Sequence, residues 1–295
     1  MYQLIIIGAG PAGLAAGLFA KRYGINFLLI GQISESAINQ AHLVENYPGL
    51  KPMTGPQLIK EFQKHSAVKI KPEQAERIYL ANSKSFQVKT NKGKYQSQAL
   101  ILATGMKFRK LGIINEEKFL DKGISYYIPD DIRLFKNKIM AVIGGGDTAL
   151  TTALKLADQA KKVYLIHRRD EFRGASLLVK RVKKRKNIEI IYQAQVVQAE
   201  GKKLLEKIIL DNNRECKVNK LFIEVGGIPN VFLCQGLKAK MENNFVIVDQ
   251  NQSANLPGLF AAGDITNQPL KLIVTAAAQG AMAATSAYNY LKSIN

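Results

Sequence analysis

Two glycine-rich segments carry the clearest chemical signal in the sequence, because glycine turns at helix starts commonly bind nucleotide phosphates. Gly8, Gly10 and Gly13 form a GxGxxG pattern directly after an apolar run. The first glycine of this pattern permits a tight turn, the second lets the backbone approach a pyrophosphate, and the third allows close helix packing. The start of the helix then faces the negative charge. We therefore predict a dinucleotide site that includes Gly8, Gly10, Pro11, Ala12 and Gly13.

The second glycine-rich segment repeats the pattern, with Ala149 in place of the last glycine, as the motif allows. The apolar run that follows ends in His167 and several arginines, where a site for NADH would have an acid. Guanidinium groups bind a 2′-phosphate through charge-assisted, often bidentate hydrogen bonds. We predict an NADPH site formed by Gly144, Gly145, Gly146, Asp147, Thr148, His167, Arg168, Arg169 and Arg173.

The elements that position both sites follow from the apolar pattern. Residues 2–30 and 138–166 each predict a strand, a glycine turn, a helix and a second strand. Further strands are expected at 99–103 and 258–262, with ligand-facing ends at Thr104, Gly105, Gly263 and Asp264. The first site lacks the usual ribose-binding acid, so Gly31 and Gln32 are expected there instead. Turn residues cluster at 106–112 and 226–230, which predicts two hinges.

Composition narrows the function classes. The chain has 295 residues and a formal net charge of +19, much of it within residues 161–186. This stretch indicates a docking face for an acidic protein or a solvated helix face, while nucleic acid is disfavoured because no aromatic residues interleave with Lys180–Lys186. No apolar run approaches the roughly 20 residues of a membrane span. The absence of a leader predicts a cytoplasmic protein, and no metal-binding spacing is visible.

Several segments together resemble the low-molecular-weight thioredoxin reductases, the class II pyridine nucleotide-disulfide oxidoreductases. The matching segments are Gly8–Gly13, Glu45–Gly49, Gly144–Ala149, His167–Arg173 and Ala261–Asp264. The resemblance covers nearly the whole chain. It implies an α/β fold with two Rossmann-like domains, in which an NADPH-binding domain at 108–230 is inserted into a discontinuous FAD-binding domain at 1–107 and 231–295. It also implies a homodimer, and FAD contacts from Asn46 and Asp264. Lys271 stands where the family usually has arginine near the flavin.

The main departure from the family is the loss of its redox-active CxxC. Tyr127 and Asp130 occupy the two cysteine positions, so the usual route to thioredoxin, which needs a thiolate, is closed. The lost cysteines and the basic surface together indicate an NADPH reductase for ferredoxin or flavodoxin. Two alternatives remain open: disulfide chemistry through Cys216 or Cys234, and a redox-sensing flavoprotein that is not an enzyme.

Three residues near the lost CxxC are candidate catalytic groups. Asp130 and Asp131 could supply a proton to the flavin, with one pKa raised if the two are close and desolvated. The alternative is a helix cap, because Pro129 and two aspartates are typical of a helix start. Tyr127, with Tyr126, would either shield the flavin ring by stacking or pack between domains.

Overall fold

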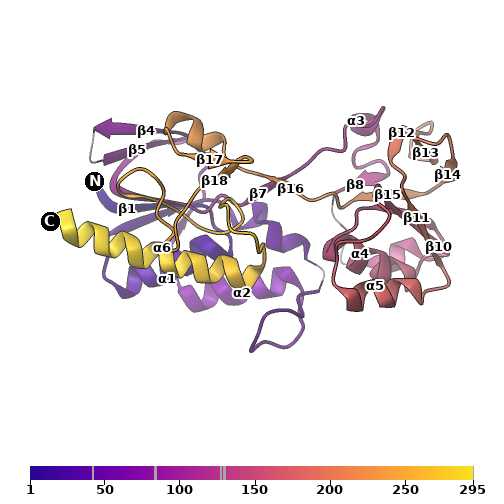
Figure 1. Cartoon of the computed structure of the whole chain (residues 1–295), viewed down its shortest axis with the longest axis horizontal. Coiled ribbons are helices and arrows are strands. Elements are labelled where there is room, and N and C mark those ends of the chain that lie inside the picture. The colour runs from indigo at the N-terminus through magenta and orange to yellow at the C-terminus, as the bar shows by residue number, and fades with distance from the viewer. Residues whose placement is uncertain (42, 83–84, 127, 129–130, 295) are drawn as a thin grey trace. The chain divides into compact units, whose positions relative to one another are not determined.

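A computed structural model describes residues 1–41, 43–82, 85–126, 128 and 131–294. The chain divides into two compact units (Figure 1). The first unit combines Met1–Lys107 with Ile228–Asn295, and the second is the intervening Phe108–Gly227. Each unit has its own sheet, mixed in the first and parallel in the second, and its own apolar core. Within the described ranges, no helix is both long and apolar enough to cross a membrane.

The first unit is built on a sheet with the strand order β3-β2-β1-β6-β5-β4. Strand β6 pairs with three strands: with β1, with β5 through Lys94–Ser97, and with β19 through Leu100–Leu102. The predicted strand–turn–helix–strand unit over 2–30 is confirmed. The strands are β1 (Tyr2–Ile7), β2 (Phe27–Ile30), β3 (Ile70–Lys71), β4 (Ala75–Asn82), β5 (Ser85–Thr90), β6 (Lys94–Leu102), β17 (Met241–Glu242), β18 (Phe245–Val246) and β19 (Leu259–Ala261).

Both faces of this sheet are buried, so its central strands are continuously apolar rather than alternating. On β1, Leu4 and Ile6 face a layer formed by α1 and α6, which lie side by side (Figure 1). Ile5 and Ile7 face the opposite core, which includes Leu233 and other residues of the second segment. The helices are α1 (Pro11–Arg22), α2 (Gly55–Ser66) and α6 (Ile273–Ile294), with 3-10 turns η1 (Ile33–Glu35), η2 (Ala37–Gln40) and η4 (Phe232–Gly236).

The second unit repeats the design with the parallel sheet order β11-β10-β9-β15-β8. Helices α4 and α5 cover one face, and an antiparallel sheet of β12, β13 and β14 covers the other. The predicted unit over 138–166 is confirmed by β9, α4 and β10. The elements are α3 (Glu116–Phe119), β8 (Ile124–Ser125), η3 (Ile132–Phe135), β9 (Ile139–Ile143), α4 (Asp147–Ala157), β10 (Lys162–His167), α5 (Ser176–Lys183), β11 (Ile188–Tyr192), β12 (Val196–Glu200), β13 (Lys207–Leu210), β14 (Glu215–Lys217) and β15 (Lys220–Ile223).

The segments predicted as hinges contain more regular structure than their turn residues indicate. β7 (Met106–Phe108) and β16 (Gly227–Pro229) form a two-stranded sheet with each other. The adjoining Gly105 and Gly226 both have positive φ, at +61° and +80°. The two crossings of the chain are therefore bound together as a ribbon flanked by glycines, and are not independent turns.

Helix α6 approaches α1 closely at Gly280, and a substitution there tests how closely the two helices pack. A Cβ added at Gly280 would lie 2.1 Å from the carbonyl oxygen of Ala12, in the first turn of α1. Helix propensity alone predicts that Gly280→Ala stabilises the protein by about 1 kcal/mol. We expect the opposite sign, a loss of roughly 1–3 kcal/mol in the free energy of unfolding, because the two helix backbones must separate.

Urea denaturation of the FAD-loaded protein measures this change. Ala278→Ser, at an exposed position of the same helix, is the control and should change stability little. A stabilised Gly280→Ala protein would show that the helices do not approach each other so closely.

Candidate functional site

The first candidate site lies where four parallel strands of the first unit end together. Ile7 at the end of β1 pairs with Ile30 of β2 and Leu102 of β6, and Leu102 pairs with Ala261 of β19. The residues that follow these strand ends include every predicted strand-end position of the first site: Gly8, Gly31, Gln32, Thr104, Gly105, Gly263 and Asp264. Ligands in open α/β sheets bind at this carboxyl edge, so the sheet register brings the predicted residues to the place a nucleotide needs.

The turn at Gly8 leaves no room for a side chain. Its φ is +117°, and an added Cβ would lie 2.1 Å from the carbonyl oxygen of Ala103. Helix α1 starts after Gly10 without a side-chain cap, whereas α2 has a complete capping box formed by Thr54 and Gln57. The first N–H groups of α1 are therefore left for an anion. This donor set fits the pyrophosphate of a dinucleotide.

Ser36 is a further residue of this site that was not among the predicted cofactor contacts. Its hydroxyl oxygen would lie 3.0 Å from a Cβ at Gly10, so it faces the glycine turn from η1. The turn residue Gly31, next to Gln32, also packs against the backbone of Gly8 and Ala9. A serine in a loop carries no recognisable motif, which is why only the structure reveals its position.

The second chain segment meets the first at Gly263, where an added Cβ would lie 3.1 Å from the side chain of Ala12. Burial raises the pKa of the adjacent Asp264 carboxyl, an effect that the charge of Lys271 opposes. The Lys271 ammonium donates a hydrogen bond to the carbonyl of Thr266 and lies 4.3 Å from the centre of the Phe245 ring. Asp264 is thus a partly buried acceptor beside the start of α1.

Thr104 and Asn46, two other predicted contacts of the first site, have surroundings that do not indicate a cofactor. The hydroxyl of Thr104 donates to the carbonyl of Asn230 at 2.9 Å, so it already binds the second chain segment. Asn46 is exposed. Their contacts with a cofactor, like that of Lys271, stay predictions.

The second unit builds its site in the same way. Ile143 at the end of β9 pairs with Ile166 of β10 and with Ile223 of β15. Gly144 has a φ of +149°, and an added Cβ would lie 2.4 Å from the carbonyl oxygen of Glu224. Helix α4 starts after Gly146, again without a side-chain cap, and the space around Gly146 is open. The helix start, with Thr148 in its first turn, is therefore accessible to an anion.

The loop after β10 folds back onto this turn. The N–H groups of Arg173 and Gly174 donate to the carbonyl of Gly145 at 2.8 and 3.0 Å. The carboxylate of Asp147 accepts the N–H of Ala175 at 2.7 Å. Asp147 therefore has a structural contact of its own, and its predicted contact with the nucleotide stays a prediction.

His167 is buried beneath the turn, with only 5% of its surface exposed. A Cβ at Gly145 would lie 2.3 Å from its ring, and its Nε2 is buried with no hydrogen-bond partner among the residues that the structure describes. Burial lowers its pKa, and the nearby arginine charges lower it further. A neutral His167 therefore supports the glycine turn and keeps one nitrogen free for a partner that the protein itself does not supply.

The three predicted arginines, Arg168, Arg169 and Arg173, are exposed. Within the described part of the chain, none of them forms an ion pair with an acidic side chain. Guanidinium groups left unpaired beside an uncapped helix are the donor set that a 2′-phosphorylated dinucleotide requires. The residues of the second unit therefore fit NADPH.

The candidate catalytic residues are only partly described. Tyr127 and Asp130 lie outside the described residues. Asp131 caps η3 and forms a two-point ion pair with Arg133 at 2.8 and 2.9 Å. This partner lowers the pKa of Asp131, whereas an acid near the flavin was expected to have a raised pKa. Asp131 therefore caps η3, as the helix-cap alternative predicts, and the neighbouring guanidinium outweighs any desolvation. A catalytic role for Asp131 stays a prediction.

Tyr126 also has a partner within its own unit. Its hydroxyl donates to the Glu116 carboxylate and accepts the N–H of Leu111 at 3.2 Å. Burial raises the pKa of Tyr126, and the hydrogen bond to Glu116 raises it further. The tyrosine hydroxyl is therefore held as part of the turn that precedes α3.

Both cysteines are buried and free. Cys216 lies in β14 of the second unit and Cys234 in η4 of the first, with exposed fractions of 1% and 2%. Burial raises the pKa of Cys216 and raises that of Cys234 to about 11. Attack on a disulfide requires an accessible thiolate, which neither residue provides.

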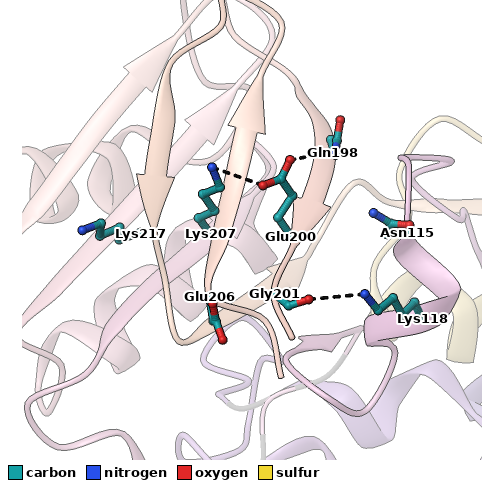
Figure 2. A pocket seen from close by; sticks show the side chains of 8 residues that line it. All are labelled: Asn115, Lys118, Gln198, Glu200, Gly201, Glu206, Lys207 and Lys217. Atoms are coloured by element: carbon teal, nitrogen blue, oxygen red, sulfur yellow. Dashed lines mark hydrogen bonds and ion pairs between the residues drawn. The ribbon is translucent and has the colours of Figure 1, made fainter. Parts of the chain in front are cut away.

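A polar cavity of about 640 Å³ lies elsewhere on the second unit (Figure 2). Its side chains bind one another: Lys207 pairs with Glu200 at 3.1 Å, and Lys118 donates to the carbonyl of Gly201 at 3.3 Å. None of the predicted site residues lines it. In the part of the chain that the structure describes, no cluster of three or more His, Cys, Asp or Glu side chains could hold a metal ion.

Comparison with known proteins agrees with this geometry. Residues 2–280 match the model of the pyridine nucleotide-disulphide oxidoreductases, and the chain belongs to this family. A thioredoxin reductase of Mycoplasma genitalium is 36% identical over 294 residues, which cover 96% of this chain and 93% of the relative. The chain is thus a thioredoxin reductase-like, NADPH-dependent flavoprotein oxidoreductase, with FAD and NADPH as its cofactors.

Solved structures lead to the same class. Thioredoxin reductase of Lactococcus lactis aligns with a TM-score of 0.93 at 29% identity, covering 99% of this chain and 100% of the other. The enzyme of T. acidophilum aligns with a TM-score of 0.91 at 30% identity, covering 100% and 99%. The Rossmann-type fold expected from the sequence is therefore present.

The exposed arginines predict how the protein distinguishes its nicotinamide cofactors. Replacing Arg168 and Arg169 with alanine should remove charge-assisted bonds worth roughly 1.5–3 kcal/mol each, which only the 2′-phosphate receives. We expect KM for NADPH to rise at least about tenfold, with little change for NADH, in ferricyanide reduction. Arg77→Ala, at an exposed position of the first unit, is the control. Equal losses with both cofactors would contradict the assignment.

Proposed function

We propose that the first unit holds FAD, that the second unit holds NADPH, and that electrons leave the flavin for a protein carrier instead of a cysteine pair in the chain. Ferredoxin and flavodoxin are the carriers that fit best. The observation that carries this proposal is the state of the two cysteines, which are buried, lie in different units and have raised pKa values. The chain therefore lacks the exposed thiol pair that disulfide exchange needs.

In this proposal the residues of each unit have separate tasks. The uncapped start of α1 and Ser36 receive the FAD pyrophosphate, with Asp264 as an acceptor from the second segment. The uncapped start of α4 receives the NADPH pyrophosphate, and Arg168, Arg169 and Arg173 receive the 2′-phosphate. Bound FAD would supply the centre that takes two electrons from NADPH and releases them singly or as a pair.

The positive charge on and after α5 supports the proposal that the partner is an acidic carrier. Residues 161–186 contain 11 Lys or Arg and only 2 Asp or Glu. Some of these charges are neutralised internally, because Lys162 pairs with Glu189 at 2.6 Å and Arg185 pairs with Asp158. The exposed Lys180, Lys183, Lys184 and Lys186 have no acidic partner among the described residues, and we call them the α5 basic face. Such a face attracts an acidic protein over several ångströms.

Two relatives give this choice of partner further support. A protein of Clostridium pasteurianum, 31% identical over 299 residues, is described as a 34.2 kDa protein in the rubredoxin operon. A structure from Clostridium acetobutylicum, with a TM-score of 0.55 and 30% identity, is named a ferredoxin-flavin thioredoxin reductase. Rubredoxin and ferredoxin are small iron proteins that carry single electrons, so a carrier of this type is compatible with the family.

Reduction of a thioredoxin-type disulfide is the second candidate, favoured by the names of the relatives. Without an exposed cysteine pair, the disulfide would have to receive electrons from the flavin without the chain's own thiols. A homodimer, the arrangement implied by the family resemblance, is compatible with either candidate.

Salt dependence tests the carrier proposal. The Debye length falls from about 30 Å at 0.01 M to about 10 Å at 0.1 M ionic strength. Over this range kcat/KM for ferredoxin or flavodoxin should fall several-fold. Charge reversal of Lys180, Lys183 and Lys184 should reproduce part of the loss at low salt. Flavin reduction by NADPH, followed by stopped flow, should persist because these lysines are separate from the proposed NADPH contacts.

The matched control reverses three exposed lysines of the first unit, Lys60, Lys64 and Lys92, which changes the net charge by the same amount. This control should retain most of the carrier activity. The proposal is wrong if neither carrier is reduced faster than oxygen at low salt, or if both triple variants lose activity equally.

The cysteines give an independent test of the second candidate. Replacing Cys216 and Cys234 with alanine avoids a buried hydroxyl, whose unpaired burial is costly. We expect NADPH-driven reduction of ferricyanide and of the physiological carrier to stay within about twofold of the original, because buried thiols take no part. Loss of most activity in a variant that retains FAD and its unfolding midpoint would favour disulfide chemistry.

A further inference from the structure

Glu224 is an acidic residue in an otherwise apolar strand end, and it is not one of the predicted site residues. It follows β15 directly, in the run Leu221 to Val225. Its N–H donates to the carbonyl of Ile143 at 2.8 Å, and its own carbonyl oxygen packs against Gly144. Glu224 is thus part of the wall of the second glycine turn.

The Glu224 side chain is partly buried without a cation. The hydroxyl of Thr152, a fully buried residue of α4, donates to one carboxylate oxygen at 3.2 Å. Among the described residues no Lys, Arg or His forms an ion pair with it. Burial raises its pKa to about 7, and the Thr152 bond opposes the rise. A desolvated carboxyl without a cationic partner is unfavourable by itself, which points to a partner that the protein does not supply.

The strand order places this carboxyl on a defined side of the site. The sheet runs β11-β10-β9-β15-β8, so the crevice of the topological switch point lies between the ends of β9 and β15. The arginines that follow β10 lie on one side of this crevice, and Glu224 lies on the other. A dinucleotide with its 2′-phosphate on the arginine side and its pyrophosphate at α4 extends its nicotinamide end toward Glu224.

We propose that Glu224 is a positioning residue for the nicotinamide end of the dinucleotide and that its carboxylate favours the oxidised, positively charged ring over the neutral reduced ring. This inference rests on the proposed placement of NADPH in the second unit. Tighter binding of NADP⁺ than of NADPH makes the bound nicotinamide a stronger reductant. Each tenfold preference lowers the potential of the bound two-electron couple by about 30 mV, so Glu224 increases the driving force for flavin reduction.

Among the described residues, few other ionisable groups lie on the elements that pack around Glu224. The elements that pack around it are β9, α4 and β8. β9 and β8 carry no charged residue, and α4 carries Asp147 and Lys155 near its two ends. Asp147 holds the N–H of Ala175. Within this set, burial raises the pKa of Glu224 to about 7, between the two pH values compared below.

Binding measurements on the oxidised, FAD-loaded protein test the proposal without relying on turnover. The ligands are NADP⁺, its redox-inactive 1,4,5,6-tetrahydro analogue with a neutral ring, and adenosine 2′,5′-bisphosphate, which lacks the nicotinamide. At pH 8 we expect Glu224→Gln to reduce the preference for NADP⁺ over the tetrahydro analogue roughly fivefold, the size expected for a solvent-screened ion pair. Binding of adenosine 2′,5′-bisphosphate should not change.

The pH dependence of the unmodified protein gives a second readout that needs no variant. Glu224 is mostly ionised at pH 8 and mostly protonated at pH 6, so the preference for NADP⁺ should shrink as pH falls and should stay flat in Glu224→Gln. The ratio of the two dissociation constants cancels titration of the 2′-phosphate, because both ligands carry it. Glu206→Gln, on the polar cavity of the same unit, is the matched control and should behave as the unmodified protein does.

The outcomes distinguish an error in the role of Glu224 from an error in the placement of NADPH. Equal weakening of NADP⁺ and the tetrahydro analogue, or a preference that does not depend on pH, overturns the role of Glu224. Adenosine 2′,5′-bisphosphate that binds as well to the Arg168 and Arg169 variants as to the original overturns the proposed placement of NADPH instead.

Discussion

The close approach of backbone to backbone at Gly8 and Gly144 is the constraint on which both halves of the molecule depend. In each unit the strand that leads into the helix start, β1 or β9, is followed by a glycine. The missing Cβ of this glycine makes room for a carbonyl at a neighbouring strand end, Ala103 in one unit and Glu224 in the other. A side chain at either position would push the strand ends apart and move the start of α1 or α4. The two uncapped helix starts are aimed at the edge of their sheets only because these contacts are so short.

Around this shared design, the differences in side chains decide what each unit binds and what the protein does. The first unit presents the partly buried Asp264, whereas the second presents exposed arginines and a buried, neutral His167. The family's cysteine pair is absent, and the remaining thiols are held inside the two cores. In the proposed function, electrons from NADPH therefore do not pass through thiols of this chain. The surface of the protein then selects the electron acceptor.

Local patterns in the sequence were enough to predict the two strand–turn–helix–strand units and the later strands, because apolar periodicity and glycine spacing are local properties. They could not predict interactions between residues far apart in the chain. The carboxylate of Asp147 binds the N–H of Ala175, His167 packs on Gly145, and Glu224 meets Thr152. Asp131 shows a different limit: its partner Arg133 is only two residues away, but the sequence alone did not indicate which neighbour would set its pKa. Glu224 is visible in the sequence as an acid in an apolar run, but its contact with Thr152 joins residues 72 positions apart.

The proposed function requires that FAD is the one redox centre of this chain, which a count of the electrons taken up per FAD can test. The oxidised protein would be titrated with dithionite under anaerobic conditions while the flavin absorbance and the FAD content are measured on the same sample. The account predicts complete reduction after two electrons per FAD, with the same count in a variant that lacks both cysteines. Uptake of four electrons per FAD would contradict it, because the additional pair would have to reside in a disulfide.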